Sequence, residues 1–108
     1  MYNGYMKKGK EIKMKTVSIF EKGPSFVADQ IVEAAEWVCG DWPQDEGFGS
    51  SDRKAVYHDA LRSIIGAENV SNWMKGNLEF NPVEWQMFKD FADLQINEQL
   101  IRSEQRYA

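Results

Sequence analysis

The chain has 108 residues, of which 43% are hydrophobic and 28% charged, and its formal net charge is -4 at neutral pH. This length and composition predict one globular domain with a modest hydrophobic core. The single cysteine excludes an internal disulfide and a metal cage built from cysteines, which favours a reducing, cytoplasmic environment. No apolar run approaches the roughly 20 residues that cross a bilayer, so neither a membrane-spanning segment nor a signal peptide is expected.

The charge is distributed unevenly along the chain. Five of the 13 Lys and Arg residues lie in residues 1–15, but only one of the 17 Asp and Glu residues does, which leaves residues 16–108 with 8 basic and 16 acidic side chains and a net charge of -8. We therefore divide the chain into a basic, flexible N-terminal extension, residues 1–15, and an acidic helical domain, residues 16–108. The lysines of the extension are suited to contacts with phosphate groups, so a nucleic-acid-binding arm is one alternative function.

The first expected elements are a short strand and a helix. Residues 15–20 contain β-branched residues in partial alternation, which predicts a strand whose local partner would be residues 5–13 in a hairpin. Gly23-Pro24-Ser25 predicts a helix over residues 25–39, because proline suits the first turn and serine offers a capping hydroxyl. Helical spacing assigns these residues to the core side of that helix: Val27, Ile31, Ala34, Ala35 and Val38.

Two further helices are predicted before the last one. After a loop that contains Pro43, Gly47 and Gly49, Ser50 or Ser51 is expected to cap a second helix that ends at Gly66. Its apolar stripe consists of Val56, Tyr57, Ala60, Leu61, Ile64 and Ile65. A short third helix over residues 68–75, closed by Gly76, is expected to turn Val70, Trp73 and Met74 inward.

The last helix has the clearest start. Asn81-Pro82-Val83-Glu84 matches a capping box with proline at the first helical position, and no glycine or proline interrupts the chain from there to Arg102 or beyond. One stripe of this helix consists of Trp85, Phe88, Ala92, Ile96 and Leu100, and a second, broadly opposite stripe consists of Met87, Phe91, Leu94 and Ile101. The second stripe either packs under the loop aromatics Trp42 and Phe48 or forms a homodimer or partner interface, and the two interpretations carry equal weight.

These patterns together predict a mainly α fold. The expected architecture is a single small domain of three to four helices with a long C-terminal helix, and a short strand or hairpin at its N-terminal end. No repeat or low-complexity segment suggests a second domain.

Catalytic and cofactor motifs match poorly. Cys39 and His58 would provide a nucleophile and a base, but a free cysteine at the end of an apolar helix is usually a buried hydrophobe, so a small enzyme that uses this pair is the second alternative. A calcium-binding loop that begins at Asp41 would need glycine at its sixth position, where this chain has Glu46, so the pattern does not match. Gly47 and Gly49 match the first two glycines of the phosphate-binding motif G-x-G-x-x-G. Asp52 occupies the position of the third glycine, so the match is incomplete. No metal or other cofactor is therefore expected.

Acidic and aromatic residues are concentrated between Asp29 and Glu46, where no lysine or arginine occurs. An uncompensated negative surface steers association with a positive one, and tryptophan is enriched at the energetic centres of protein interfaces. We therefore predict a surface that binds a protein partner with a basic surface. The predicted partner-binding residues are Asp29, Glu33, Glu36, Trp37, Asp41, Trp42, Asp45, Glu46 and Phe48.

The leading functional hypothesis follows from this surface. A small, acidic, aromatic-rich chain without a catalytic signature resembles the accessory proteins of phages and mobile elements that bind and block host machines. The hypothesis is an inhibitor or regulator that docks on a nucleic-acid-handling machine, where its acids would mimic nucleic acid. It ranks above the lysine-arm nucleic-acid binder and the Cys39/His58 enzyme.

Overall fold

The computed structural model describes residues 14–39 and 49–107. They form four helices and two short strands: β2 (Lys15–Val17), α1 (Pro24–Cys39), α2 (Ser50–Ile65), α3 (Ala67–Met74), β3 (Leu78–Phe80) and α4 (Pro82–Tyr107). The mainly helical fold with a long C-terminal helix, predicted from the hydrophobic periodicity, is confirmed. Of the predicted extension, residues 1–15, only Met14 and Lys15 are described.

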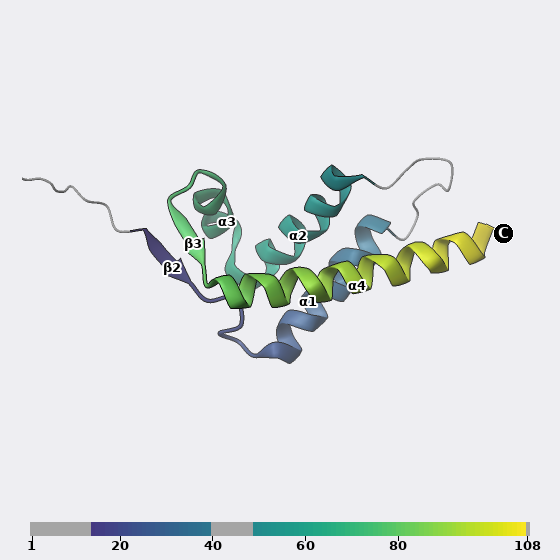
Figure 1. Ribbon diagram of the computed structural model, residues 1–108, viewed down its shortest axis with the longest axis horizontal. Helices are drawn as coiled ribbons and strands as arrows, with labels where there is room; N and C mark the ends of the chain where they lie inside the picture. The colour runs from purple at the N-terminus through teal and green to yellow at the C-terminus, as the bar shows by residue number, and fades with distance from the viewer. Residues whose placement is uncertain (1–13, 40–48, 108) are drawn as a thin grey trace, which may run out of the picture.

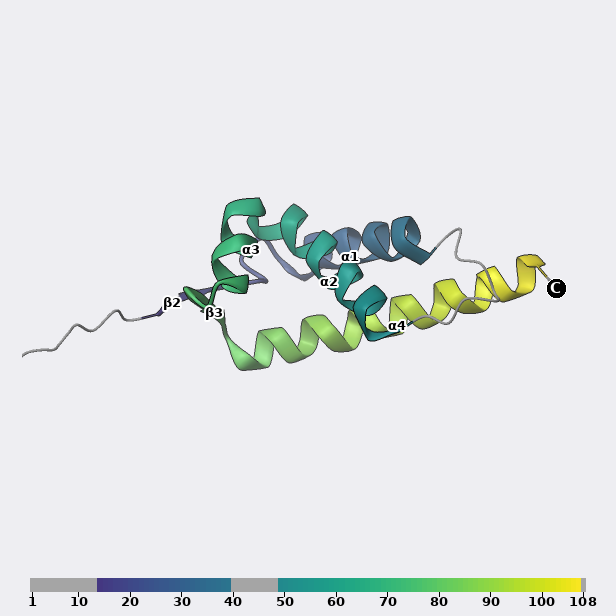
Figure 2. The ribbon, with the colours of Figure 1, turned by 90° about the horizontal axis from the view of Figure 1, so that it is seen from above.

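The helices are arranged in two layers. In Figure 2, α4 forms one layer, and α1 and α2 lie together in the other, while β2, β3 and α3 occupy one end of the molecule. Helix α1 packs against both α2 and α4, and α2 also contacts α4. Side chains from all three helices form the core, and those almost completely buried are Val27, Ile31, Ala34, Ala35, Cys39, Val56, Ala60, Leu61, Phe88, Ala92 and Ile96.

Burial supports most of the predicted helix faces and corrects one. The first stripe of α4 faces the core, with Phe88, Ala92 and Ile96 fully buried. Helix α3 turns Val70 inward as predicted, but its Met74 is 63% exposed. The prediction that Met74 points inward is therefore wrong, because α3 is only eight residues long and packs on α2 and β3 through its other face.

The strand predicted near the N-terminus is present, and its partner comes from far along the chain. Strand β2 pairs in parallel with β3, with Lys15 opposite Leu78 and Val17 opposite Phe80. Parallel strands need a long crossover connection, which α1, α2 and α3 provide here (Figure 1). Residues 5–13, the expected hairpin partner, lie outside the described residues.

The cap of α2 differs from the predicted one, whereas Asn81 caps α4 as predicted. Helix α2 begins at Ser50 and is preceded by Gly49, whose backbone N–H donates to a carboxylate oxygen of Asp52 at 2.9 Å, so the expected serine cap is wrong. Asn81 does cap α4, because its side-chain oxygen accepts hydrogen bonds from the backbone N–H groups of Val83 and Glu84 at 2.9 and 3.1 Å. Gly66, between α2 and α3, has a φ of 92°, which a side-chain-bearing residue would adopt only with strain.

Glu84 ties the N-terminal segment to α4 instead of completing a capping box. One carboxylate oxygen accepts a hydrogen bond from the backbone N–H of Ile19 at 3.0 Å, and the other accepts one from the hydroxyl of Ser18 at 3.0 Å. These bonds join residues more than 60 positions apart and hold the chain between β2 and α1 against the start of α4.

A Glu84→Ala variant is expected to lose about 1 to 3 kcal/mol of unfolding free energy, because the Ile19 N–H then lies partly buried without an acceptor. Urea unfolding followed by circular dichroism measures the loss. Glu84→Gln keeps an oxygen acceptor and serves as the matched control, with a smaller expected loss. Wild-type stability in the alanine variant would show that this anchor contributes nothing.

Candidate functional site

The acidic face of α1, defined as Asp29, Glu33 and Glu36, is solvent-exposed along its length. The residues are four and three positions apart, so successive turns of α1 present them on one side of the helix. None of them forms an ion pair with any residue that the structure describes. The structure thus brings together three of the predicted acids as uncompensated charges. The predicted site residues Asp41, Trp42, Asp45, Glu46 and Phe48 lie outside the described residues.

Trp37 lies beside this acidic face and is 83% exposed. Four positions after Glu33, it projects on the side of α1 that approaches α2. A hollow of about 320 Å³ opens there between the two helices, and its lining consists of Gln30, Glu33, Ala34, Trp37, Asp59 and Ser63. The hollow adds the Asp59 carboxylate from α2 to the negative charge contributed by α1, and no lysine or arginine is among its lining residues.

Of the two acids that line this hollow, Asp59 forms an ion pair with a residue that the structure describes. A guanidinium nitrogen of Arg62 lies 3.5 Å from a carboxylate oxygen of Asp59, one helical turn away, and both side chains are substantially exposed. An exposed ion pair of this kind is screened by water and contributes little to stability. Arg62 therefore offsets part of the Asp59 charge, but it forms no ion pair with Asp29, Glu33 or Glu36 among the described residues.

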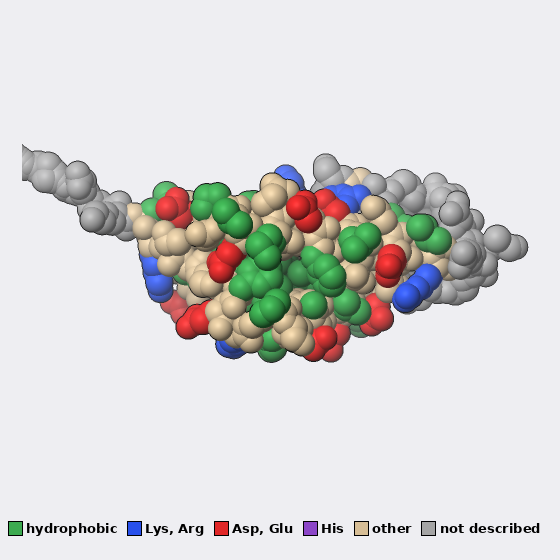
Figure 3. All heavy atoms as spheres, turned by 60° about the horizontal axis from the view of Figure 1, so that its bottom comes forward, with side chains coloured by type: hydrophobic (Ala, Val, Ile, Leu, Met, Phe, Trp, Pro, Cys, Tyr) green, Lys and Arg blue, Asp and Glu red, His purple; other side chains and the backbone are tan. Residues whose placement is uncertain are grey.

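The second predicted surface, Met87, Phe91, Leu94 and Ile101 on α4, is exposed to different degrees. Met87, Leu94 and Ile101 are 52%, 54% and 53% exposed, and Phe91 is half-buried. An apolar groove of about 250 Å³ lies between α1 and α4, and its lining consists of Phe20, Pro24, Val27, Ala28, Ile31, Met87 and Phe91. Figure 3 shows hydrophobic side chains gathered on this face. The predicted packing of Trp42 and Phe48 over this stripe is not tested, because both residues lie outside the described part of the chain.

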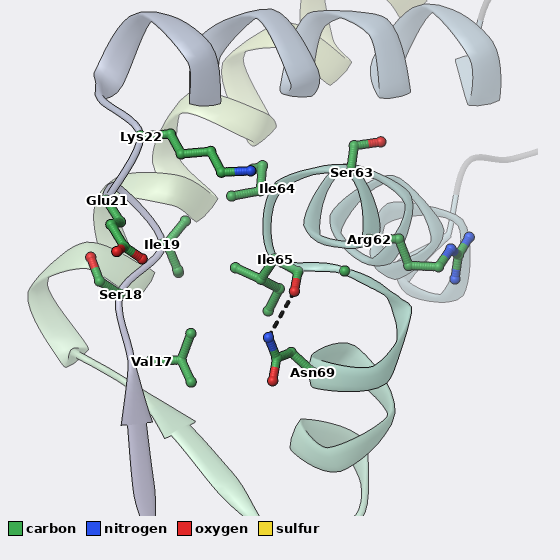
Figure 4. Close-up of a pocket in the computed structure, with 11 residues that line it drawn as sticks. Val17, Ser18, Ile19, Glu21, Lys22, Arg62, Ser63, Ile64, Ile65 and Asn69 are labelled. Atoms are coloured by element: carbon green, nitrogen blue, oxygen red, sulfur yellow. Dashed lines mark hydrogen bonds between the residues drawn. The ribbon is translucent and has the colours of Figure 1, made fainter.

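A further cavity, of about 370 Å³, lies between the segment that joins β2 to α1 and the junction of α2 and α3. In Figure 4, Lys22 extends across it toward Ile64, and Glu21 lies on the opposite edge from Arg62. Asn69 donates its side-chain N–H to the backbone oxygen of Ile65 at 2.8 Å, which fixes that edge. Sequence reasoning missed this cavity because its walls come from segments about 40 residues apart, and no local motif marks them.

Cys39 and His58, the candidate catalytic pair, have different neighbours. Cys39 is fully buried at the end of α1, and its charged neighbours are Arg53 and Asp52. The ring of His58 packs edge-on against Trp73 at 5.5 Å, and its pKa is lowered by burial and by the nearby charges of Arg62 and Lys54. No hydrogen bond joins the two side chains among the described residues.

The pKa of the Cys39 thiol also moves in the direction opposite to that of an activated nucleophile. Burial raises it to about 11, and the nearby Arg53 charge opposes that rise only in part. Catalytic thiols have lowered pKa values that maintain a reactive thiolate near neutral pH. The Cys39 side chain has instead the environment of a small core hydrophobe.

We therefore expect the Cys39 thiol to react slowly with a disulfide reagent such as Ellman's reagent at pH 8 in the native protein, and rapidly in urea. Both its burial and its raised pKa reduce the concentration of accessible thiolate. The time course of thionitrobenzoate release measures the difference. Equal rates in the native and unfolded protein would show that the end of α1 opens freely.

The comparisons with known proteins identify no relative. No family model matches the chain, and no curated protein or solved structure matches it either. Within residues 14–39 and 49–107, no group of three or more His, Cys, Asp and Glu side chains is placed to hold a metal ion. No described helix is long and apolar enough to cross a membrane.

Proposed function

We propose that this protein is a small acidic binding protein that docks on a basic surface of a protein partner through the acidic face of α1 and Trp37. The observation that carries the proposal is the exposure of Trp37, 83%, beside Glu33 and Glu36 on a face that Asp29 continues, with no ion pair of these acids among the described residues. A tryptophan held in water loses the burial free energy that a core position would provide. A partner that covers the Trp37 ring in a complex would recover this burial free energy.

The two kinds of residue have separate roles in such an interface. Exposed carboxylates on one helix face produce a negative potential that speeds the encounter with a basic partner and disfavours acidic ones. Trp37 supplies a large apolar surface that loses contact with water only in the complex, as residues at interface centres do. The hollow between α1 and α2 gives room beside the Trp37 ring for a side chain of the partner.

The class of partner follows from the charge. Surfaces that bind nucleic acid are rich in Lys and Arg, and a run of carboxylates competes with phosphates for them. An inhibitor or regulator of a nucleic-acid-handling machine in the cytoplasm, of the kind that phages and mobile elements encode, fits this charge pattern. The proposal rests on the charge and exposure of the α1 face and on no catalytic group.

The test begins with affinity capture of the partner from an extract of the source cells, followed by its identification and purification. Binding kinetics are then measured for Trp37→Ala and for a Glu33→Lys, Glu36→Lys double variant. We expect Trp37→Ala to weaken binding by tenfold or more, mainly through faster dissociation, and the double reversal to slow association. All three residues are exposed, so the melting temperatures should stay near that of the wild type.

Glu21→Lys provides the matched control, because Glu21 is an exposed acid in the turn before α1 and lies off the acidic face. It makes half the charge change of the double variant at another place. Affinity and association rate that stay at wild-type values in both α1 variants would contradict the proposal. A uniform effect of all reversals, including Glu21→Lys, would indicate a response to net charge alone.

A further inference from the structure

Among the α4 side chains that the structure describes, three of the four exposed large apolar ones follow a seven-residue spacing, and the fourth, Val83, lies four positions before the first of them. Met87, Leu94 and Ile101 are each seven positions apart, and each is close to half exposed. Seven residues make nearly two turns of an α-helix, so the three side chains form a seam, and seams of this spacing fit a second helix that crosses at a small angle. We call these three residues the α4 seam. Its regularity favours a helical occupant over an extended one.

The apolar groove between α1 and α4 runs beside the first part of the seam. Met87 belongs to both, and Phe91 and Ile31 complete the contact between the two helices, with no charged side chain in the lining. A helix laid along the seam would therefore touch α1 on one side and α4 on the other. This two-sided contact is the usual way in which an amphipathic helix binds in a groove.

Carboxylates border the groove and the seam on both sides. On α1, the exposed Asp29 directly follows Ala28 of the groove lining. On α4, Asp90 and Glu98 are exposed, and each lies three or four positions from two residues of the seam. Figure 3 shows Asp and Glu side chains around the hydrophobic patch and Lys or Arg side chains farther out, toward the edges of this face. Arg102, which follows Ile101, is an exposed basic residue next to the seam, and the two acids Asp90 and Glu98 outnumber it.

This border decides between two occupants. A second copy of the chain would bring its own Asp90 and Glu98 against the same acids, and like charges across an interface cost free energy. A helix with Lys and Arg beside its apolar stripe would instead place opposite charges against the border. We propose that the groove and the α4 seam bind an amphipathic helix of the partner that carries apolar residues at seven-residue spacing, flanked by Lys and Arg. This inference deepens the proposed function and rests on it for the basic character of the partner.

The test uses a designed, fluorescently labelled peptide of about 20 residues, long enough to cover the seam. Its leucines follow the seven-residue spacing, and lysines flank them. Two control peptides accompany it: one with the same composition in an order that breaks the spacing, and one with glutamate in place of each lysine. Fluorescence anisotropy measures binding to the wild type, to a Met87→Ser, Leu94→Ser double variant, and to Met74→Ser. Met74, 63% exposed against 52% for Met87, is a methionine on α3 that does not line the groove.

We expect the basic helical peptide to bind at least tenfold more tightly than either control peptide. The double variant should lose at least tenfold in affinity, and Met74→Ser should leave it unchanged. An Asp90→Lys, Glu98→Lys variant should weaken binding of the basic peptide and strengthen binding of the acidic one. Equal affinity for the three peptides, no measurable binding, or an unaffected double variant would each overturn the inference.

Sedimentation equilibrium of the free protein examines the other occupant. A dimer that Leu94→Ser dissociates would show that the seam holds a second copy, and it would overturn the inference. The failures of the two proposals are distinguishable, because Trp37 and Glu33 line the hollow on the α2 side of α1, away from the seam. If Trp37→Ala and the Glu33→Lys, Glu36→Lys double variant weaken binding of the purified partner but the seam variants do not, the proposed function stands without a helix in this groove.

Discussion

A Phe88→Ala variant is expected to lose about 3 to 5 kcal/mol of unfolding free energy. Phe88 is completely buried on the core side of α4, so its removal leaves a cavity among three helices that cannot all move inward. Its ring stacks on Trp85 with centroids 5.6 Å apart and meets Tyr57 edge-on at 6.1 Å, and both contacts disappear with it. The total unfolding free energy of a small domain is only about 5 to 15 kcal/mol, so urea unfolding should show a large shift of the midpoint.

The neighbouring Met87 supplies the control for this prediction. Met87 precedes Phe88 by one position, which turns it about 100° around the helix, and its side chain is 52% exposed. Met87→Ala should change the unfolding free energy by less than about 1 kcal/mol, apart from a small change in helix propensity. Comparable losses in the two variants would mean that α4 presents a different face to the core.

The α4 result illustrates what hydrophobic periodicity can predict. Two stripes on one helix were identified from residue spacing, and burial assigns Phe88, Ala92 and Ile96 to the core and leaves Met87 and Leu94 exposed. Spacing fixes the angle between side chains around a helix, because the backbone geometry is constant. It does not tell which side faces the other helices, since that depends on packing between distant segments.

The short strands show the opposite limit. Three residues, Leu78–Phe80, are too few to display an alternating pattern, and their partner strand β2 lies more than 60 positions earlier in the chain. Glu84 was assigned to a local capping box for the same reason: its true partners, Ser18 and Ile19, are equally distant. Local rules fail where a long-range contact satisfies the same hydrogen-bonding group in another way.

The candidate site was predictable in part. The spacing of Asp29, Glu33 and Glu36 predicts a shared helix face, and the structure has them exposed on one. Trp37 was predicted to belong to the partner-binding surface, but a helical projection does not show what covers a side chain, and most tryptophans are largely buried, so its high exposure could not be derived. The α1–α2 hollow and the α1–α4 groove likewise exist only after the helices have packed.

The second large effect is expected at Asp93, which joins α4 to α2. One of its carboxylate oxygens accepts hydrogen bonds from the hydroxyl of Tyr57 and from a guanidinium nitrogen of Arg53, the latter at 2.8 Å. Asp93→Ala should cost about 1 to 3 kcal/mol of unfolding free energy, because it removes the acceptor from two partly buried donors. Asp93→Asn, which keeps an oxygen acceptor but no charge, should cost less.

The same cluster predicts how stability depends on pH. Burial raises the pKa of Tyr57 from 10.0 to about 12, and the hydrogen bond to Asp93 and the Asp93 charge add to the rise, while Arg53 opposes it. Since the folded-state pKa is the higher one, Tyr57 contributes its stability fully below pH 10 and loses it as the pH rises toward 12. Urea unfolding at several alkaline pH values should therefore show that the unfolding free energy declines with rising pH, and that it declines less steeply in Tyr57→Phe than in the wild type. Tyrosinate absorbance should show that Asp93→Asn lowers the Tyr57 pKa. If the unfolding free energy of Tyr57→Phe declines as steeply with pH as that of the wild type, other groups control the loss of stability at alkaline pH. The Asp93 cluster is then a packing contact without electrostatic linkage.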